Sequence, residues 1–351
     1  MPREIDIQLF LQKAISLPII DVRTPAEFKQ GHIPTAFNIP LFSNKERKTV
    51  GTSYKNEGQK EALIKGLDFA GPKMSAFVRK AQKIAHNNKL LVHCWRGGMR
   101  SASMAWLFET AGMDCYLLKE GYKSFRQFVL AHANHSFPFI VIGGLTGSGK
   151  TAALKSLADL GEQILDLEAL AHHKGSAFGN LGEKSQDSTE HFENKICWDL
   201  LPLDKNRTIW IEDESRSIGR NILPSGIYHQ IRTAPLVFLD IPLMDRLDRL
   251  VEDYAGFSTE ELCESIQKIS QRLGGDITRK AIEAVSKKDY KLTVEMVLQY
   301  YDKTYQHGLH NHNQKLVFKL PAENVHDSAS VASQILSFAR QHPEQLTPTL
   351  P

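Results

Sequence analysis

The sequence has few cysteines and no pattern that pairs them. Its four cysteines are Cys94, Cys115, Cys197 and Cys263, and no two of them form a CxxC pair. Neither zinc ligation nor a disulfide framework is therefore indicated. We expect no metal site built from cysteines, and we expect Cys115, Cys197 and Cys263 to be small buried or incidental residues.

Long hydrophobic runs are also missing. No uninterrupted apolar stretch approaches the roughly 20 residues that a membrane helix requires. The N-terminal sequence Met-Pro-Arg-Glu-Ile-Asp lacks the apolar core of a secretion signal. We therefore expect a cytoplasmic protein with no membrane partner.

The sequence shows no strong excess of one charge. Forty-three Lys and Arg residues nearly balance 40 Asp and Glu residues, which leaves a net charge of +3. A nucleic-acid partner is permitted by this balance but not required by it. The 351 residues, 42% of them hydrophobic, suffice for two globular domains with cores of their own.

Two strand-loop-helix patterns indicate an α/β fold. In the first half, short apolar runs at 18–22 and 89–93 predict buried parallel strands, and helical spacing predicts helices over about 75–87 and 100–111. In the second half, the run 138–143 predicts a strand that enters a glycine loop, followed by a helix from Lys150 to about Leu160.

The remaining patterns suggest where the domains begin and end. Residues 127–137 lose their apolar rhythm and are interpreted as a connector, which divides the chain into domains 1–134 and 135–345. Further strands are expected at 207–212 and 235–240, and a mostly helical part from 242 to about 306. The tail, 346–351, is expected to be disordered.

The first glycine loop carries a cysteine. Cys94 follows the strand 89–93 and precedes a helix, so its thiol should lie where backbone N–H groups and a helix N-terminus converge. Such a position favours a thiolate and binds an anion at the same place. The positive charges and flexible backbone of this cradle come from Arg96, Gly97, Gly98 and Arg100, with Ser101 beside them.

The second glycine loop is a phosphate-binding motif. The pattern Gly-x4-Gly-Lys-Thr begins at Gly144 and ends at Thr151, between an apolar strand and a helix, which is the context the motif requires. Its backbone amides would wrap a phosphate, Lys150 would reach a terminal phosphate, and the Thr151 hydroxyl could ligate Mg²⁺. The residues expected to bind a diphosphate are Gly144, Thr146, Gly147, Ser148, Gly149, Lys150 and Thr151.

An acidic partner is expected at a neighbouring strand end. Asp213 is the nearest match, with Glu212 close behind, although the run Glu212-Asp213-Glu214 could instead be a solvated corner. Residues 165–179, which include His172 and His173, are interpreted as a loop over the site. Five arginines, at 216, 220, 232, 246 and 249, could receive phosphates or form surface ion pairs.

The first half resembles rhodanese-like domains. The strings Ile20-Asp21-Val22-Arg23-Thr24-Pro25-Ala26-Glu27-Phe28 and Gly31-His32-Ile33-Pro34 resemble their opening signature, and Gly121-Tyr122 resembles their closing one. In that family the matching cysteine carries sulfur or selenium as a persulfide or perselenide. One departure is that Arg100 lies six positions after Cys94 instead of five, as in rhodanese-fold phosphatases and arsenate reductases, and the longer loop admits a tetrahedral oxyanion.

Taken over nearly its whole length, the chain resembles the tRNA 2-selenouridine synthase family. The strings that carry this resemblance are His93-Cys-Trp-Arg-Gly-Gly-Met-Arg-Ser101, Gly143-Gly-Leu-Thr-Gly-Ser-Gly-Lys-Thr151 and Ile211-Glu-Asp-Glu-Ser-Arg216. The resemblance implies action on wobble 2-thiouridine in the tRNAs for lysine, glutamate and glutamine. It implies S-geranylation from geranyl diphosphate, then selenation from selenophosphate.

The resemblance also suggests roles for the two loops. Cys94 would carry selenium, the residues around it would bind selenophosphate, and the second loop would grip the diphosphate of the geranyl donor. No tightly bound cofactor is implied, and a selenophosphate-supplying enzyme is a candidate partner. Two other interpretations stay open: a rhodanese-fold phosphatase or reductase fused to a small-molecule kinase, and a nucleotide-gated binding module with an inert cysteine.

Overall fold

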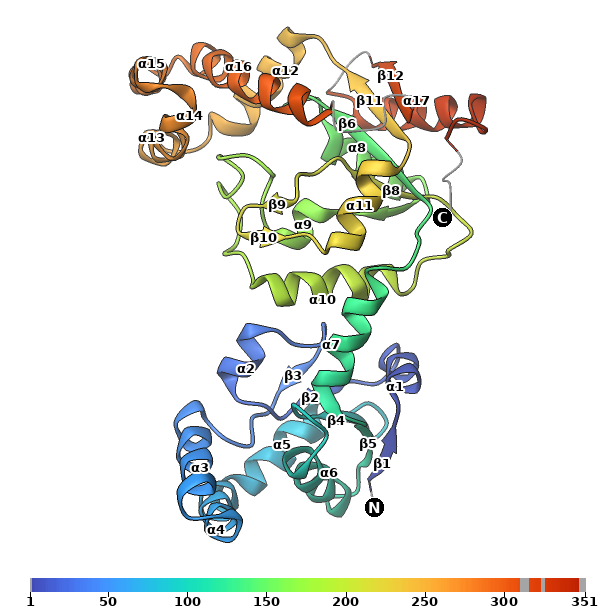
Figure 1. Cartoon of the computed structure of the whole chain (residues 1–351), viewed down its shortest axis with the longest axis vertical. Helices are drawn as coiled ribbons and strands as arrows, with labels where there is room; N and C mark the ends of the chain where they lie inside the picture. Colours follow the sequence, from blue (N-terminus) through green and yellow to red (C-terminus); the bar gives the residue numbers. More distant parts are fainter. Residues whose placement is uncertain (1, 310–315, 323–325, 347–351) are drawn as a thin grey trace. The chain divides into compact units, whose positions relative to one another are not determined.

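The chain divides into two compact units. The computed structural model describes residues 2–309, 316–322 and 326–346, without the side chains of 306–308. One unit comprises residues 1–132 with 193–197, and the other comprises 133–192 with 198–351 (Figure 1). Each unit is built around a parallel sheet and is described by itself.

The first unit contains a five-stranded parallel sheet in the order β1-β5-β4-β2-β3. Its strands are β1(Arg3–Ile5), β2(Ile19–Asp21), β3(Phe37–Asn38), β4(Lys89–His93) and β5(Asp114–Leu118). Strand β4 lies between β5 and β2, and its last four residues are buried. This position directs the chain into the cysteine loop at the carboxyl edge of the sheet.

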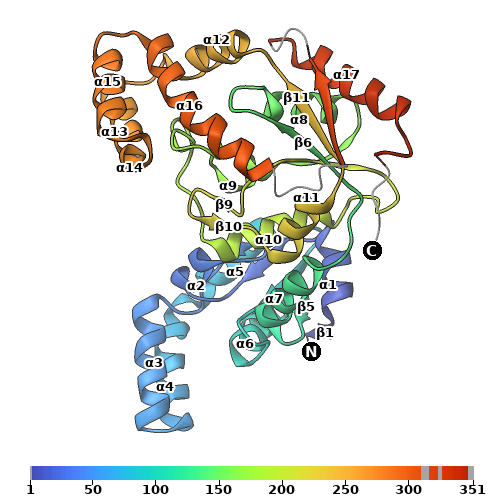
Figure 2. The same ribbon diagram turned by 45° about the horizontal axis from the view of Figure 1, so that its top comes forward.

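Helices surround this sheet, and two of them form a separate hairpin. They are α1(Ile7–Ala14), α2(Pro25–Gln30), α3(Asn44–Asn56), α4(Gln59–Ala70), η1(Gly71–Lys73), α5(Met74–Ile84), α6(Met99–Thr110) and α7(Gly121–His132). Helices α3 and α4 lie side by side in both Figure 1 and Figure 2. Residues from β2, β4, α5 and α6 share one hydrophobic core, in which Ile20, Val92, Phe77 and Phe108 are buried.

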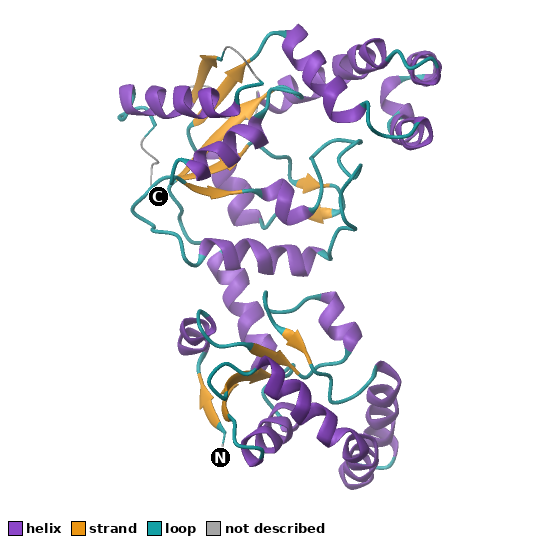
Figure 3. Cartoon of the chain, turned by 180° about the vertical axis from the view of Figure 1, so that it is seen from behind, coloured by secondary structure: helices purple, strands orange, loops and turns teal. Residues whose placement is uncertain are grey.

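The second unit contains another five-stranded parallel sheet, in the order β12-β11-β6-β8-β7, and both sheets are visible as orange strands in Figure 3. Its strands are β6(Phe139–Gly144), β7(Gln163–Leu165), β8(Ile209–Glu212), β11(Leu236–Asp240) and β12(Val317–Pro321). A separate antiparallel pair consists of β9(Ser217–Ile218) and β10(Asn221–Ile222). Strand β6 is central and wholly buried, so the glycine loop that follows it is anchored in the core.

The helices of the second unit fall into two groups. Helices α8(Lys150–Asp159) and α17(Ser328–Gln341) pack on the sheet and share its core, with Leu154, Leu157 and Ile335 buried. Helices α12(Leu243–Tyr254), α13(Thr259–Lys268), α14(Ser270–Leu273), α15(Gly275–Ser286) and α16(Tyr290–Leu309) form a helical part with an additional core of its own (Figure 2). The unit also includes α9(Leu167–Ala171) and α11(Ser225–Thr233), and α10(Thr189–Leu200) contributes residues to both units.

The predicted fold class is confirmed, and so are the six strand and helix positions expected around the two loops. Three local expectations were wrong. Helix α7 continues to His132 through the expected connector, because Val129 and His132 still face the core. The expected loop 165–179 contains helix α9. Leu346, expected in a disordered tail, is buried in the core, while 347–351 lie outside the described residues.

None of the helices in the described residues is both long and apolar enough to cross a bilayer.

Candidate functional site

The cysteine loop connects β4 to α6. Cys94 is the first residue after the strand, and its side chain is almost fully buried, with 3% exposed. The Ser101 hydroxyl donates a hydrogen bond to the Cys94 Sγ over 3.2 Å. Because α6 begins at Met99 and Ser101 lies in its first turn, the Cys94 sulfur lies beside the N-terminus of this helix, where unpaired N–H groups attract anions.

Two glycines allow the loop to pack against the start of α7. Gly97 and Gly121 both have positive φ, at 67° and 60°. A Cβ on Gly121 would overlap the Cys94 carbonyl oxygen and lie 2.5 Å from the Gly97 nitrogen. The Tyr122 N–H donates to the same Cys94 oxygen over 2.8 Å. The Gly121-Tyr122 signature therefore fixes the backbone of the cysteine loop.

The two arginines of the loop have different environments. Arg100 forms an ion pair with Glu27, with an Nη1–Oε2 distance of 2.9 Å, whereas Arg96 is exposed. Burial raises the pKa of Glu27, but hydrogen bonds and charge from Arg100, together with the Thr24 cap, hold the pKa below its ordinary value. Glu27 therefore holds Arg100 in position at the loop.

A buried charge network lies beneath the loop. Asp21 and Arg23 are fully buried and paired over 2.6 Å, and the Arg23 guanidinium lies 3.8 Å from the centre of the Tyr122 ring. Burial lowers the pKa of His93 to about 4, although Asp21 opposes this shift. His93 is therefore neutral near pH 7 and fully buried at the end of β4.

The other cysteines have no comparable environment. Burial raises the pKa of the Cys115 and Cys197 thiols to about 12, so neither forms a thiolate near neutral pH. Cys263 is partly exposed, and burial raises its pKa as well.

The phosphate loop connects β6 to α8. Gly147 and Gly149 have φ values of 83° and 81°, and a Cβ on Gly147 would lie 2.9 Å from the Arg246 carbonyl oxygen. The Lys150 ammonium donates to the Gly144 carbonyl oxygen over 2.9 Å, so the lysine folds back over the loop. The Arg246 guanidinium donates to the Thr146 carbonyl oxygen and pairs with Asp302, which supports the loop from α12. The loop is thus held in place by its own lysine and by Arg246 of α12.

Carboxylates gather behind Lys150 and Thr151. The Thr151 hydroxyl donates to Glu168 over 2.9 Å, and Glu212 ends β8, beside the end of β6. Burial and the neighbouring acids Glu168 and Asp166 raise the pKa of Glu212 well above its ordinary value. Burial and Glu168 likewise raise the pKa of Glu214 to about 8. The acidic run is therefore a buried cluster and not a solvated corner.

Asp213 faces a different set of partners. It forms an ion pair with Arg232 and accepts a hydrogen bond from the Tyr305 hydroxyl over 2.5 Å. The Tyr305 hydroxyl in turn accepts a hydrogen bond from the Gly144 N–H over 3.1 Å. Asp213 thus supports the beginning of the phosphate loop, while Glu212 and Glu168 lie nearer to Thr151.

The acidic cluster also suits a magnesium ion that accompanies a phosphate. Mg²⁺ at phosphate sites takes one or two carboxylates together with phosphate oxygens and water. Both carboxylate oxygens of Glu212 are buried without a geometric hydrogen-bond partner in the described part of the chain, and the Thr151 hydroxyl lies in the same cluster. No group of three or more His, Cys, Asp or Glu side chains among the described residues is arranged to hold a metal ion.

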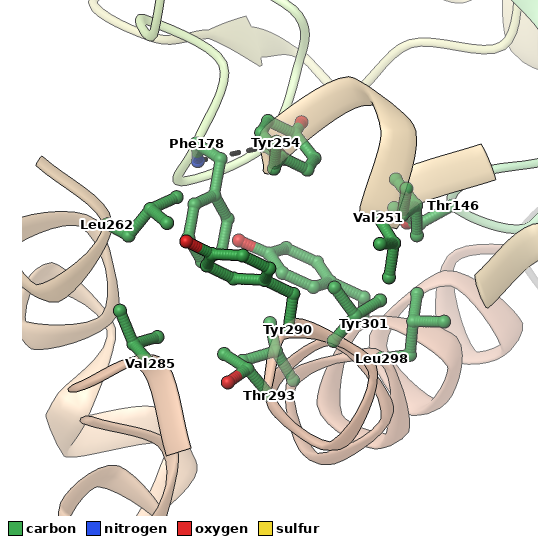
Figure 4. A pocket seen from close by; sticks show the side chains of 14 residues that line it. Thr146, Phe178, Val251, Tyr254, Leu262, Val285, Tyr290, Thr293, Leu298 and Tyr301 are labelled. Atoms are coloured by element: carbon green, nitrogen blue, oxygen red, sulfur yellow. Dashed lines mark hydrogen bonds between the residues drawn. The ribbon is translucent and has the colours of Figure 1, made fainter. Parts of the chain in front are cut away.

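A small apolar cavity adjoins the phosphate loop. Its volume is about 40 Å³, and Thr146 forms part of its wall. Figure 4 shows the rings of Phe178, Tyr254, Tyr290 and Tyr301 around it, from a loop and from helices α12 and α16. The side of the loop next to Thr146 is therefore apolar and aromatic.

Sequence reasoning missed Glu168 and Tyr305. Glu168 could have been noticed as the acid that follows the strand 163–165, but the order of strands that brings it to Thr151 is not readable from spacing. Tyr305 is 161 residues from its partner Gly144, and no local signal marks it. Of the five arginines, Arg232 and Arg246 form ion pairs beside the phosphate loop.

Comparisons with known proteins match both halves of the chain. A family model described as the tRNA 2-selenouridine synthase AAA domain matches residues 137–334, and the rhodanese-like domain model matches residues 8–128. A tRNA 2-selenouridine synthase of Proteus mirabilis is 33% identical over 347 residues, which cover 88% of this chain and 93% of that protein. A protein of the same name from Nitrosomonas europaea is 37% identical over 246 residues, which cover 68% of this chain and 63% of that protein.

Proposed function

This chain belongs to the tRNA 2-selenouridine synthase family, and we propose that it converts wobble 2-thiouridine to 2-selenouridine in the tRNAs for lysine, glutamate and glutamine. The conversion has two steps. The phosphate loop of the second unit supports geranyl transfer to sulfur, and the cysteine loop of the first unit supports the exchange of that sulfur for selenium.

The first step uses geranyl diphosphate as the alkyl donor. The thiocarbonyl sulfur of 2-thiouridine attacks the allylic carbon, the carbon–oxygen bond breaks, and its electron pair leaves with diphosphate. Lys150 and the loop amides stabilise the charge that develops on this leaving group. Mg²⁺, when bound by Thr151 and Glu212, would supply further positive charge to the diphosphate oxygens.

The apolar cavity beside Thr146 supports a prenyl donor over a nucleotide. A nucleotide continues from its phosphates into a polar sugar and base, whereas an allylic diphosphate continues into hydrocarbon. The aromatic wall suits hydrocarbon. At about 40 Å³ the cavity is smaller than a ten-carbon chain, so its wall would have to open when the donor binds.

The second step begins at an activated carbon. Alkylation of the sulfur makes C2 of the pyrimidine more electrophilic and gives it a thiol as leaving group. Selenium that has been released from phosphorus with its electron pair forms a bond to C2, the carbon–sulfur bond breaks, and geranylthiolate departs and takes up a proton. Arg96, Arg100, Gly97, Gly98 and Ser101 form the cradle that would hold the phosphate part of selenophosphate.

Electron balance assigns Cys94 a role at phosphorus. A perselenide at Cys94 would require an oxidant, because the release of phosphate from selenophosphate leaves selenium as selenide. We therefore replace the expected selenium-carrier role with attack of the Cys94 thiolate on phosphorus, which breaks the selenium–phosphorus bond and leaves its electron pair on selenium. Water then hydrolyses the cysteinyl phosphate. The six-residue spacing from Cys94 to Arg100 suits such a tetrahedral phosphate.

The observation that carries this proposal is the presence of two glycine loops, each at the end of a buried parallel strand, of which only one contains a cysteine. One loop is suited to covalent chemistry at phosphorus, and the other only to charge stabilisation. Two successive group transfers with two different phosphorus-containing co-substrates account for both loops.

Mass spectrometry of nucleosides tests the proposal. Purified protein is incubated with 2-thiouridine tRNA, and geranyl diphosphate and selenophosphate are added in turn. We expect S-geranyl-2-thiouridine after the first addition and 2-selenouridine after the second. Lys150→Ala should slow geranylation by about 100-fold or more, whereas Lys155→Ala, an exposed lysine on the same helix, should not.

The cysteine is tested in the same assay. Cys94→Ser should geranylate normally and accumulate the S-geranyl nucleoside, and Cys263→Ser should behave as wild type. Loss of both steps in Cys94→Ser would contradict the division of labour. Release of phosphate from an aryl phosphate, or ATP turnover, without any change in the tRNA would favour the phosphatase–kinase interpretation.

A further inference from the structure

A large apolar groove adjoins Cys94 in the first unit. Its volume is about 870 Å³, within the range of sites that bind small molecules. One end contains Cys94, Arg96 and Arg100, which are the residues of the cysteine loop. Away from the loop, the walls come from the α3–α4 hairpin, from α5 and from α6 (Figure 1).

The groove exposes an unusual amount of hydrocarbon. Leu67 and Trp106 line it and are 58% and 57% exposed, and Leu63 lines it at 44%. Isolated exposed apolar residues are common on protein surfaces, but a contiguous patch that begins at a reactive residue marks a binding site. Packing in the core does not explain why these positions are apolar, since their side chains face the open volume of the groove.

The hairpin keeps the groove open. Gly51 and Gly66 line the groove from the interiors of α3 and α4, where glycine is less favourable than alanine. A Cβ on Gly51 would lie 2.9 Å from Arg47 Nη1, and a Cβ on Gly66 would lie 3.4 Å from the Phe42 ring. Glycine at both positions therefore leaves room for two side chains that line the groove.

We propose that this groove binds the geranyl chain of the S-geranylated tRNA base during the selenation step. The inference rests on the proposed function, because it takes the S-geranyl nucleoside as the substrate of that step. With C2 of the base at the cysteine loop, the geranylthio group leaves from the same atom that selenium attacks. An apolar groove that starts at this loop gives the ten-carbon chain a place to lie, and the cationic end keeps selenophosphate at the reacting carbon.

The groove would then distinguish the intermediate from unmodified tRNA. Unalkylated 2-thiouridine has no chain to fill the groove, so it gains nothing from these walls. Binding of hydrocarbon next to the reacting carbon would therefore make the cysteine loop act on the geranylated base in preference to the starting base.

A comparison of two RNA substrates tests the groove. Anticodon stem-loop RNAs carrying S-geranyl- or S-methyl-2-thiouridine are given selenophosphate, and 2-selenouridine is measured by mass spectrometry. We expect the wild-type kcat/KM for the geranyl RNA to exceed that for the methyl RNA by about tenfold or more. The double variant Leu63→Ser/Leu67→Ser should lose this preference and keep its activity on the methyl RNA within about twofold. Ile15→Ser, at an 87% exposed site outside the groove, is the matched control.

Binding is measured separately from turnover. The nucleoside S-geranyl-2-thiouridine should quench the fluorescence of Trp95 and Trp106, which line the groove, and the S-methyl nucleoside should quench it much less. The double variant should lose the quenching. Equal kcat/KM for the two RNAs in the wild type, or equal losses on both in the double variant, would overturn the groove assignment while leaving the proposed function standing.

Two further outcomes separate the explanations. Quenching by the geranyl nucleoside without any 2-selenouridine formation would contradict the proposed function but support the groove as a binding site for the geranyl group. If the double variant instead loses geranylation, and geranyl diphosphate displaces the nucleoside from the groove, then the groove belongs to the donor of the first step and the assignment to the intermediate is overturned.

Discussion

At the scale of single residues, the phosphate loop is distinguished by its buried acids. Glu214 lies among Glu168, Asp213 and Lys150, and burial together with Glu168 raises its pKa from 4.5 to about 8. The lysine opposes this shift but does not cancel it. Buried acids that lie side by side would repel one another if all of them were ionised, so their protonation should affect the free energy of unfolding.

Glu214 should make stability depend on pH. Because its pKa is about 8 in the folded state and 4.5 as the reference value, the folded state binds more protons between these pH values. The free energy of unfolding should therefore fall as the pH rises from about 4.5 to 8, by on the order of a few kcal/mol. Glu214→Gln should flatten this slope in urea denaturation at pH 5, 6, 7 and 8. An unchanged slope would show that Glu214 does not titrate in this range, and the exposed Glu264→Gln serves as control.

Motif residues were predictable at this scale, and their partners were not. The position of Cys94 and Lys150 follows from strand, loop and helix patterns that are local in sequence. The pairing of Arg100 with Glu27 spans 73 residues, and it decides which arginine of the cradle is fixed and which is exposed. A spacing pattern cannot reveal such a pair, because it depends on which elements the fold brings together.

At the scale of elements, the start of α7 positions the cysteine loop. Gly121 lies where the loop backbone passes closest, and the Tyr122 N–H is bonded to the Cys94 carbonyl oxygen. The sequence signature Gly121-Tyr122 thus has a physical cause that is separate from catalysis. The two segments touch at Gly121, so the chain has no room for a side chain at this position.

Gly121→Ala should disturb both folding and the second step. The new Cβ would overlap the Cys94 carbonyl, and φ at this position is 60°. We expect a loss of about 2–5 kcal/mol in urea denaturation, from backbone strain and overpacking together, and slower selenation with normal geranylation. Gly112→Ala is the matched control, because its φ is 86° but no atom lies within 4 Å of its Cβ. Similar losses in both variants would mean that backbone conformation, and not contact with the loop, is responsible.

Elements with a buried apolar face were predicted well, and elements without one were not. Strands β4 and β6 are buried runs, and both were expected. The α3–α4 hairpin was not anticipated, because much of its apolar surface faces a groove and gives no regular burial pattern. The end of α7 was missed for a related reason: His132 is buried there, and a buried histidine does not look like a core residue in sequence.

At the scale of the whole molecule, the two units have independent cores. Cys94 belongs to the core cluster of the first sheet, and the strand before Lys150 belongs to that of the second. The repeated strand-loop-helix pattern was enough to predict two α/β domains. It could not predict that β12 completes the second sheet and that α17 packs on it, because both follow a helical part that begins at Leu243 and ends at Leu309.

Independent cores predict that the two steps can be separated and then recombined. Cys94→Ser protein should geranylate tRNA but not selenate it, and Lys150→Ala protein should selenate only tRNA that is already geranylated. A mixture of the two should form 2-selenouridine after a lag, since the geranylated tRNA must leave one molecule and bind another. The lag should shorten as the protein concentration rises, as followed by nucleoside mass spectrometry over time.

The controls for this mixture decide how the intermediate is passed on. Replacing the Lys150→Ala partner with a Cys94→Ser/Lys150→Ala protein should give no 2-selenouridine, because no intact cysteine loop is then present. If each single variant performs its own step on supplied substrate but the mixture gives no product, the intermediate does not leave the chain that made it. Both loops of one molecule would then have to act on the same bound tRNA, and the two units would be coupled through their common substrate although each folds around its own core.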